Sequence, residues 1–274
     1  MNRGRLLTVA RTDLRQLRQS PDFWLPMVVL AGFFFIVAPA ILLSAVTAAG
    51  RSPTVQRVAT AVDVLPARAQ EAVEGTTPAG RTTYALAVYL FAPLAVIVPM
   101  TISTAVGAAT LVGERERGTG EFLAHSPASE REIYLGKLLA SMIPGYATTL
   151  VGFGVYSLIV NLIVGPRVGG WFFPTREWWV LMLWVVPPFL ALTLSVVLRL
   201  SARVKSSAAA QQASGLVTLP LIMVSYAQSS GFVFGGTAAG LLVGVLVWAV
   251  AAAGLWRGAR AVTRPRLLGI DARL

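Results

Sequence analysis

The chain has no cysteine and a single histidine, His125. Without cysteine it forms no disulfide, no thiolate metal site and no thiol nucleophile, and one histidine leaves no HExxH zinc motif. No GxSxG serine motif and no GxxxxGK[ST] phosphate loop occurs, since Gly136-Lys137 is followed by leucine and lacks the earlier glycine. These absences argue against the common hydrolase classes and exclude a P-loop for ATP in this chain.

Charge is scarce as well: 13% of the residues are charged, whereas 55% are hydrophobic. The apolar residues fall in runs near or above the roughly 20 residues that cross a bilayer as a helix. The sequence therefore predicts an all-α polytopic membrane protein embedded in a lipid bilayer. Its net charge of +11 does not predict nucleic-acid binding, because lysines and arginines beside membrane spans set orientation.

Six segments are long and apolar enough to be transmembrane helices, each at least about 30 Å long: residues 24–46, 84–112, 138–164, 179–198, 207–228 and 237–256. Polar and basic residues precede the first, and its apolar run exceeds a usual signal-peptide core, so it is predicted to be a retained span. Residues 47–83 form a long outer loop. The whole chain, 1–274, is predicted to be one transmembrane domain.

Six spans place both termini on the same side of the membrane. That side holds 17 lysines and arginines and the other side holds 6. Both termini and the loop after the second span are therefore predicted to be cytoplasmic. Trp171, Trp178 and Trp179 then fall at the outer boundary, where they are predicted to anchor the protein in an aromatic belt.

Residues 1–22 are predicted to form an amphipathic helix in the inner membrane interface. Arg11, Arg15 and Arg18 lie on one face, from which they reach anionic head groups. The adjoining apolar residues recur at helical spacing: Leu6, Leu7, Ala10, Leu14 and Leu17. This pattern predicts a membrane anchor rather than a binding site.

The densest charge cluster is LVGERERGTGEFLAHSPASEREIYLGK at 111–137, which holds five of the twelve acidic residues. The second span is longer than the bilayer needs, so it is predicted to run into the cytoplasm and to end at GERER, before the break at Gly118 and Gly120. Thr119 can cap a new short helix, with Glu121 placed favourably against its dipole. Phe122 and Leu123 project from that helix.

The second half of this segment leads back to the membrane. Ser126-Pro127 ends the short helix, because the residue before proline is pushed out of the α region. Ser129-Glu130-Arg131-Glu132 matches a capping box that opens the third span. The predicted result is a short cytoplasmic helix between the second and third spans.

The charges alone admit a simpler interpretation. Glu114 with Arg117, and Arg117 with Glu121, have the three- and four-residue spacings of local ion pairs, so a solvated loop explains them equally well. Such a loop does not require Phe122 and Leu123 exposed on a capped helix. Those residues suit a partner protein that contacts both the charged side chains of the segment and the projecting apolar side chains.

No Asp, Glu, Lys or Arg lies in the central part of any predicted span. Proton-coupled carriers generally need ionisable groups at depth, so their absence counts against a self-contained carrier. The prolines in the spans leave a channel or secondary carrier as one alternative, and a membrane scaffold or assembly factor as another. Uncharged spans also favour an apolar, amphipathic or lipid-linked cargo.

GERERGTGEFLAHSPASEREIYLGKLLA, at 113–140, closely resembles the signature of ABC-2 type permeases, the six-span membrane subunits of ABC exporters. SSAAAQQASGLVTLPLIM, at 206–223, resembles the fifth span of one bacterial and archaeal branch of that family. Gly120 departs from the pattern, because the family usually has a larger apolar residue there. A glycine at this position favours a shorter and less rigid helix than the family pattern implies.

The resemblance implies a transport subunit that is not itself an enzyme, in the cytoplasmic membrane of a prokaryote. A second permease, identical or homologous, faces the first, and two copies of a separate ATPase subunit dock beneath them. ATP and Mg²⁺ are bound by that ATPase, and this chain holds no cofactor. Carried over residue by residue, the ATPase-coupling residues are Glu114, Arg115, Glu116, Arg117, Gly118, Thr119, Glu121, Phe122 and Leu123.

Overall fold

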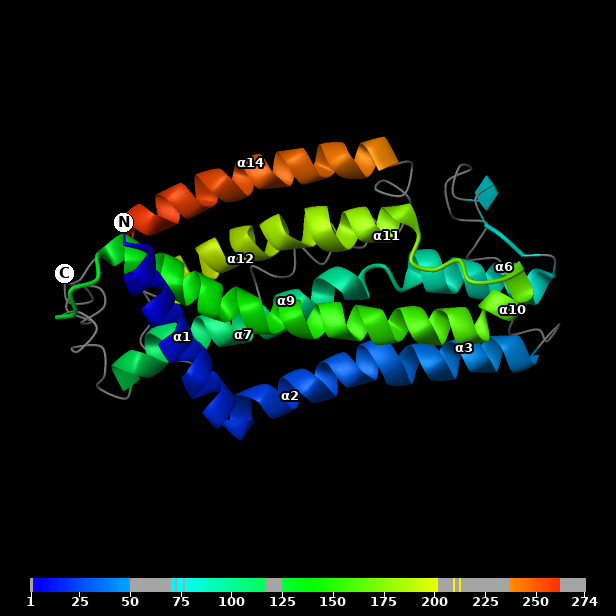
Figure 1. The fold of residues 1–274 in the computed structure, drawn as a ribbon, viewed down its shortest axis with the longest axis horizontal. Coiled ribbons are helices and arrows are strands. Elements are labelled where there is room, and N and C mark those ends of the chain that lie inside the picture. The colour runs from blue at the N-terminus through cyan, green and yellow to red at the C-terminus, as the bar shows by residue number, and fades with distance from the viewer. Residues whose placement is uncertain are drawn as a thin grey trace.

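The computed structural model describes residues 2–49, 70–71, 73–75, 77–116, 125–201, 209, 212 and 237–261, apart from the side chains at 111–116, 237, 239 and 261. All the described elements are helices. Five helical segments among them are long and apolar enough to cross a membrane: Pro21–Ala49, Pro78–Thr110, Glu130–Ile163, Arg176–Ser201 and Gly240–Arg260. They run side by side along the long axis of the molecule (Figure 1). An all-α polytopic membrane protein is thereby confirmed.

These five segments match five of the six predicted spans. The remaining predicted span, 207–228, is the fifth in chain order. It lies outside the described residues except at positions 209 and 212, so it stays a prediction. The second span begins at α6 (Pro78–Ala85), so the predicted outer loop 47–83 is too long at its end. The physical reason is a helix start: the Thr77 hydroxyl accepts the Gly80 N–H at 3.1 Å, and proline suits the first helical position.

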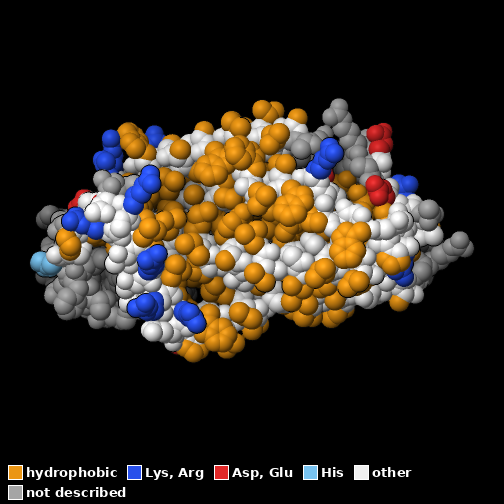
Figure 2. Space-filling view, viewed as in Figure 1, with side chains coloured by type: hydrophobic (Ala, Val, Ile, Leu, Met, Phe, Trp, Pro, Cys, Tyr) orange, Lys and Arg blue, Asp and Glu red, His pale blue; other side chains and the backbone are white. Residues whose placement is uncertain are grey.

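The two ends of the bundle differ in charge. The start of α1 (Arg3–Gln19), the end of α7 (Leu94–Glu116), the start of α9 (Glu130–Ile163) and the end of α14 (Thr237–Ala261) lie together at one end (Figure 1). Figure 2 shows Lys and Arg side chains gathered mainly at this end, and hydrophobic side chains covering the surface between the ends. This distribution is typical of a bundle whose middle faces lipid.

A short break separates α1 from the first span, which comprises α2 (Pro21–Gly32), η1 (Phe33–Val37) and α3 (Ala38–Ala49). Ser20 has an extended backbone, as expected for a residue before proline. After it the chain turns sharply, so that α1 crosses the end of the bundle at a steep angle to the spans (Figure 1). The N-terminal helix predicted within residues 1–22 is confirmed.

Among the described spans, three widen into a π-helical turn just before a proline: Phe33–Val37 before Pro39, Leu86–Leu90 (η2) before Pro93, and Leu181–Val185 (η3) before Pro187. A proline has no N–H, and its ring meets the carbonyl four residues earlier. In each case that carbonyl belongs to the widened turn, so the widening relieves the contact. Pro39, Pro93 and Pro187 therefore follow irregular turns inside the spans, whereas Pro26, Pro99 and Pro144 lie within α-helix.

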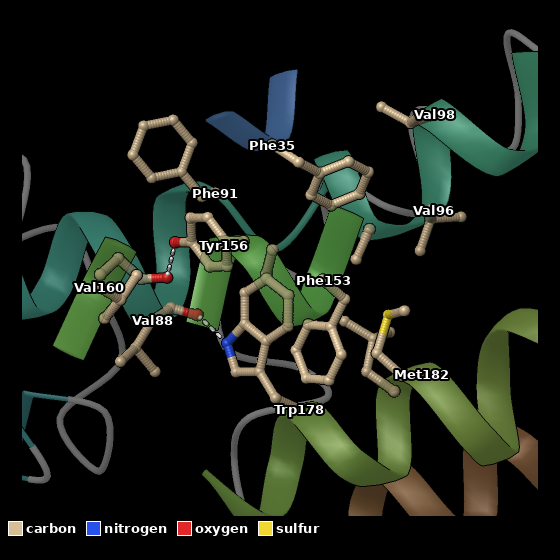
Figure 3. Packing of buried hydrophobic residues seen from close by; sticks show 14 of the residues in the cluster. Phe35, Val88, Phe91, Val96, Val98, Phe153, Tyr156, Val160, Trp178 and Met182 are labelled. Atoms are coloured by element: carbon tan, nitrogen blue, oxygen red, sulfur yellow. Dashed lines mark hydrogen bonds between the residues drawn. The ribbon is translucent and has the colours of Figure 1, made fainter. Parts of the chain in front are cut away.

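The second span is broken between η2 and α7 by a turn at 91–93. The N–H groups of this turn donate to other carbonyls, and its proline has no N–H. The carbonyls of Ala87 and Val88 therefore lack partners in their own helix. Unpaired carbonyls are costly inside a bilayer. The Tyr156 hydroxyl donates to the Ala87 carbonyl at 2.6 Å, and Trp178 Nε1 donates to the Val88 carbonyl at 2.9 Å (Figure 3). The break is thus stabilised from the neighbouring spans.

Trp178 begins the fourth span, which comprises α11 (Arg176–Val180), η3 and α12 (Val186–Ser201). The predicted interface position of Trp178 is wrong, because the side chain is 1% exposed. It stacks on Phe153 and Tyr156, with ring centroids 5.7 and 5.5 Å away. Trp171 and Trp179 are exposed. Hydrogen bonding to the broken second span explains why Trp178 is drawn inside.

The contact of α7 with α9 supplies a stability prediction. At Gly145 of α9, a Cβ would lie 2.8 Å from the Pro99 carbonyl of α7 and would also meet Ser103. Gly145→Ala is expected to destabilise the protein by about 1–3 kcal/mol through overpacking. Gly154→Ala is the matched control in the same helix, because a Cβ there meets nothing within 4 Å.

Thermal unfolding of the two purified variants in detergent tests this difference. Gly154→Ala is expected to raise stability by up to about 1 kcal/mol, because alanine is the better helix former. Equal shifts in the two variants would contradict the close α7–α9 contact.

Candidate functional site

The charged segment 113–137 begins in the last turns of α7 and ends in the first turns of α9, and both of these helix ends lie at the end of the bundle where α1 begins (Figure 1). Glu114, Arg115 and Glu116 form the last turn of α7, so the helix extends as far as the sequence predicts. The other predicted coupling residues lie outside the described residues: Arg117, Gly118, Thr119, Glu121, Phe122 and Leu123. The short helix between the spans therefore stays a prediction.

The return of the chain to the membrane follows the predicted capping box. The Glu132 N–H donates to the Ser129 hydroxyl at 3.3 Å, and the Ser129 N–H donates to the Glu132 carboxylate at 2.9 Å. The same carboxylate also accepts the N–H of Asn2. The Arg5 guanidinium donates to the Pro127 carbonyl at 2.8 Å. These bonds attach the start of α1 to the end of the charged segment.

Helix α1 then crosses α9 at Gly136. A Cβ at this position would lie 2.8 Å from the Val9 side chain and 3.1 Å from the Leu6 carbonyl, so only glycine allows the approach. The contact leaves Leu6 and Ala10 only 8% and 3% exposed. Leu7, which the predicted amphipathic pattern groups with them, is 46% exposed. Packing on α9 thus decides which part of the apolar face is buried in protein.

A buried ion pair lies one turn further along α1. The Lys137 ammonium donates to the Asp13 carboxylate at 3.3 Å and to the Thr110 carbonyl at 3.1 Å. The Lys137 side chain is 1% exposed and the Asp13 side chain is 8% exposed. We call Asp13, Thr110 and Lys137 the three-helix joint, because they come from α1, α7 and α9. Removing charges from water is costly unless they stay paired, so breaking this arrangement is expected to be strongly unfavourable.

The joint was not predicted from the sequence. A signal for Asp13 exists: it follows Leu6 and Ala10 at seven- and three-residue spacing, and so it is an acidic residue on an apolar stripe. Lys137 sits beside the buried Leu138 and Ile133. No local pattern pairs the two charges, because 124 positions separate them in the sequence.

Residues 67–249 match the family model for ABC-2 family transporter proteins. The match covers more than half of the chain. The chain belongs to the ABC-2 transporter family. A comparison with curated proteins finds no match.

Membership of the ABC-2 family makes the chain the permease component of an ABC transporter, a multi-pass membrane transport component. The matched part begins after α1. Asp13 therefore lies outside it, whereas Thr110 and Lys137 lie inside. In this ABC-2 permease, the joint attaches the N-terminal helix to two spans of the family domain.

Arg11, Arg15 and Arg18 are exposed on α1 of the ABC-2 permease. Figure 2 shows Lys and Arg side chains at the end of the bundle where α1 lies, beside the hydrophobic surface. Their position is suited to head groups, and their role as a membrane-interface anchor stays a prediction.

Proposed function

We propose that this chain is the membrane-spanning subunit of an ATP-driven exporter, coupled to a separate ATPase through the 113–137 segment. A second permease, identical or homologous, completes the translocation path. Two copies of the ATPase dock at the cytoplasmic end and bind ATP and Mg²⁺. Family membership supports the permease role, and the three-helix joint is the observation that carries the coupling.

The end of the bundle that contains the joint is the cytoplasmic end in this proposal. Of the 23 lysines and arginines, 17 belong to the tails and connections on that side. Ser201 ends α12 and Thr237 begins α14 at opposite ends of the bundle (Figure 1). This separation supports a further crossing by the predicted span 207–228, which makes six spans in a prokaryotic cytoplasmic membrane.

The joint provides a route for motion from the ATPase into the spans. An ATPase that pulls on Glu114–Leu123 pulls on the end of α7, and through the capping box it also moves the start of α9. α7 and α9 form the most extensive helix pair among the described elements, so they tilt together. The Asp13–Lys137 pair makes α1 follow them. Contiguous packed helices are the usual carriers of such coupling.

One charge reversal and one apolar-to-acidic substitution in the charged segment test the coupling. Glu116→Lys and Phe122→Asp are each expected to reduce permease-dependent ATPase activity about tenfold or more, because each disrupts a charged or apolar contact of the docking surface. Membrane insertion is expected to be unchanged. The measurements are co-purification with the candidate ATPase and ATP hydrolysis by the complex in nanodiscs.

Glu74→Lys is the matched control. It makes the same charge change at an exposed position at the opposite end of the bundle, and it is expected to leave both measurements unchanged. Normal co-purification and hydrolysis in both Glu116→Lys and Phe122→Asp would overturn the assigned coupling role. Transport by the permease alone in ATP-free liposomes would overturn the proposal as a whole.

A further inference from the structure

An open hollow of about 450 Å³ lies at the bend between α1 and α2. Its walls come from these two helices and from Pro144 of α9. Six of its seven lining side chains are apolar, and the seventh is Arg18. The volume falls within the range of about 300–1,000 Å³ that is usual for small-molecule sites, and one cation beside apolar walls fits an amphipathic ligand.

The position of the hollow indicates which molecules reach it. The bend at Ser20 is the point where the helix crossing the end of the bundle becomes a membrane span (Figure 1). Trp24, on the wall of the hollow, is 44% exposed. The hollow therefore opens on the outside of the bundle, at the boundary between head groups and acyl chains. Lipids are the molecules that fill this boundary.

The charges around the hollow favour a negatively charged lipid. Arg18 follows Arg11 and Arg15 on the exposed face of α1. Asp22, in the first turn of α2, is the nearby exposed carboxylate, whereas the Asp13 carboxylate is bound to Lys137. Positive charge is thus in excess at the rim, and a guanidinium binds phosphate oxygens through charge-assisted hydrogen bonds.

We propose that this hollow binds one anionic phospholipid of the leaflet at the α1 end. Its phosphate lies on Arg18, and an acyl chain lies against Leu14, Met27 and Pro144. This site differs from a general membrane anchor, because it holds one lipid at a defined place. It does not depend on an ATPase partner, so it can be tested on the purified chain.

Native mass spectrometry of the full-length protein in detergent, titrated with phosphatidylglycerol or phosphatidylcholine, tests the site. The wild type is expected to retain one phosphatidylglycerol per chain in preference to phosphatidylcholine. Arg18→Gln is expected to weaken phosphatidylglycerol binding about tenfold, through loss of a charge-assisted hydrogen bond. Arg11→Gln, with the same charge change on the same helix but outside the hollow, is expected to change it less than about twofold.

A second variant keeps every charge and alters the walls. Met27→Trp fills the hollow and is expected to abolish retention of the lipid while the protein still inserts. Equal weakening by Arg18→Gln and Arg11→Gln would reduce the effect to general electrostatic attraction and overturn the site. Unchanged retention in Met27→Trp, or equal retention of both lipids by the wild type, would overturn it as well.

Discussion

Asp13→Ala is expected to lower the stability of the protein by about 3–5 kcal/mol, the usual cost of breaking a buried ion pair by removing one partner. The substitution removes the carboxylate that the Lys137 ammonium, whose side chain is 1% exposed, binds at 3.3 Å. The ammonium's bond to the Thr110 carbonyl remains but does not neutralise the charge. The measurement is the thermal unfolding midpoint of the purified protein in detergent, recorded at several denaturant concentrations.

The matched control removes both charges. Asp13→Ala combined with Lys137→Met is expected to recover most of the lost stability, because apolar replacements of a buried pair are often neutral. A double-mutant cycle then isolates the pair energy from the loss of contacts. Asp13→Ala with a stability within about 0.5 kcal/mol of wild type, the range of ordinary surface substitutions, would show that the charges are not held in a buried pair.

The double variant also separates stability from coupling. If it folds and inserts but hydrolysis by the ATPase complex no longer responds to the permease, the joint transmits motion as well as holding the helices. A stable double variant with normal coupling would assign the joint a purely structural role. Neither outcome affects the stability prediction for Asp13→Ala, which the unfolding measurement tests separately.

Trp178→Ala is expected to have an effect of similar size, a loss of about 3–5 kcal/mol, as for other large aromatic truncations in packed interiors. The substitution removes a side chain that is 1% exposed and stacked between Phe153 and Tyr156. It also leaves the Val88 carbonyl, at the break in the second span, without its donor. Thermal unfolding in detergent measures the loss.

Two milder variants divide this effect into its parts. Trp178→Phe keeps an aromatic ring but loses the Nε1 donor, and Tyr156→Phe loses only the hydroxyl that donates to the Ala87 carbonyl. Tyr156→Phe is expected to cost about 0.5–1.5 kcal/mol, since hydrogen bonds within membranes contribute modestly. Trp178→Phe is expected to cost more than this and less than Trp178→Ala, because the smaller ring also leaves a cavity. A loss in Trp178→Phe as large as in Trp178→Ala would contradict the argument that the remaining aromatic packing contributes to stability.

Features that depend on neighbouring residues were predictable from the sequence. The capping box at Ser129 and Glu132 was predicted correctly, because a cap is built within four residues. The extension of α7 to Glu116 followed from the length of the apolar run.

Features that depend on how helices meet were not predictable. The place of Trp178 at the end of a span predicts an interface residue, yet the side chain is buried, because it donates to the Val88 carbonyl at the break in another span. The apolar run predicts a start of the second span six residues after the observed one at Pro78, because polar residues at a helix end carry no apolar signal. The fifth predicted span, apart from positions 209 and 212, and the short helix with Phe122 lie outside the described residues.

The sequence by itself determined that the protein is helical and crosses a membrane, because apolar length and helix caps are local properties of the chain. It also determined which end of the bundle carries most of the positive charge. Only the tertiary structure decided that Asp13 meets Lys137 and that Gly136 accommodates α1. The physical reason is distance along the chain: a buried charge selects its partner through the packing of whole helices, which no short pattern of residues records.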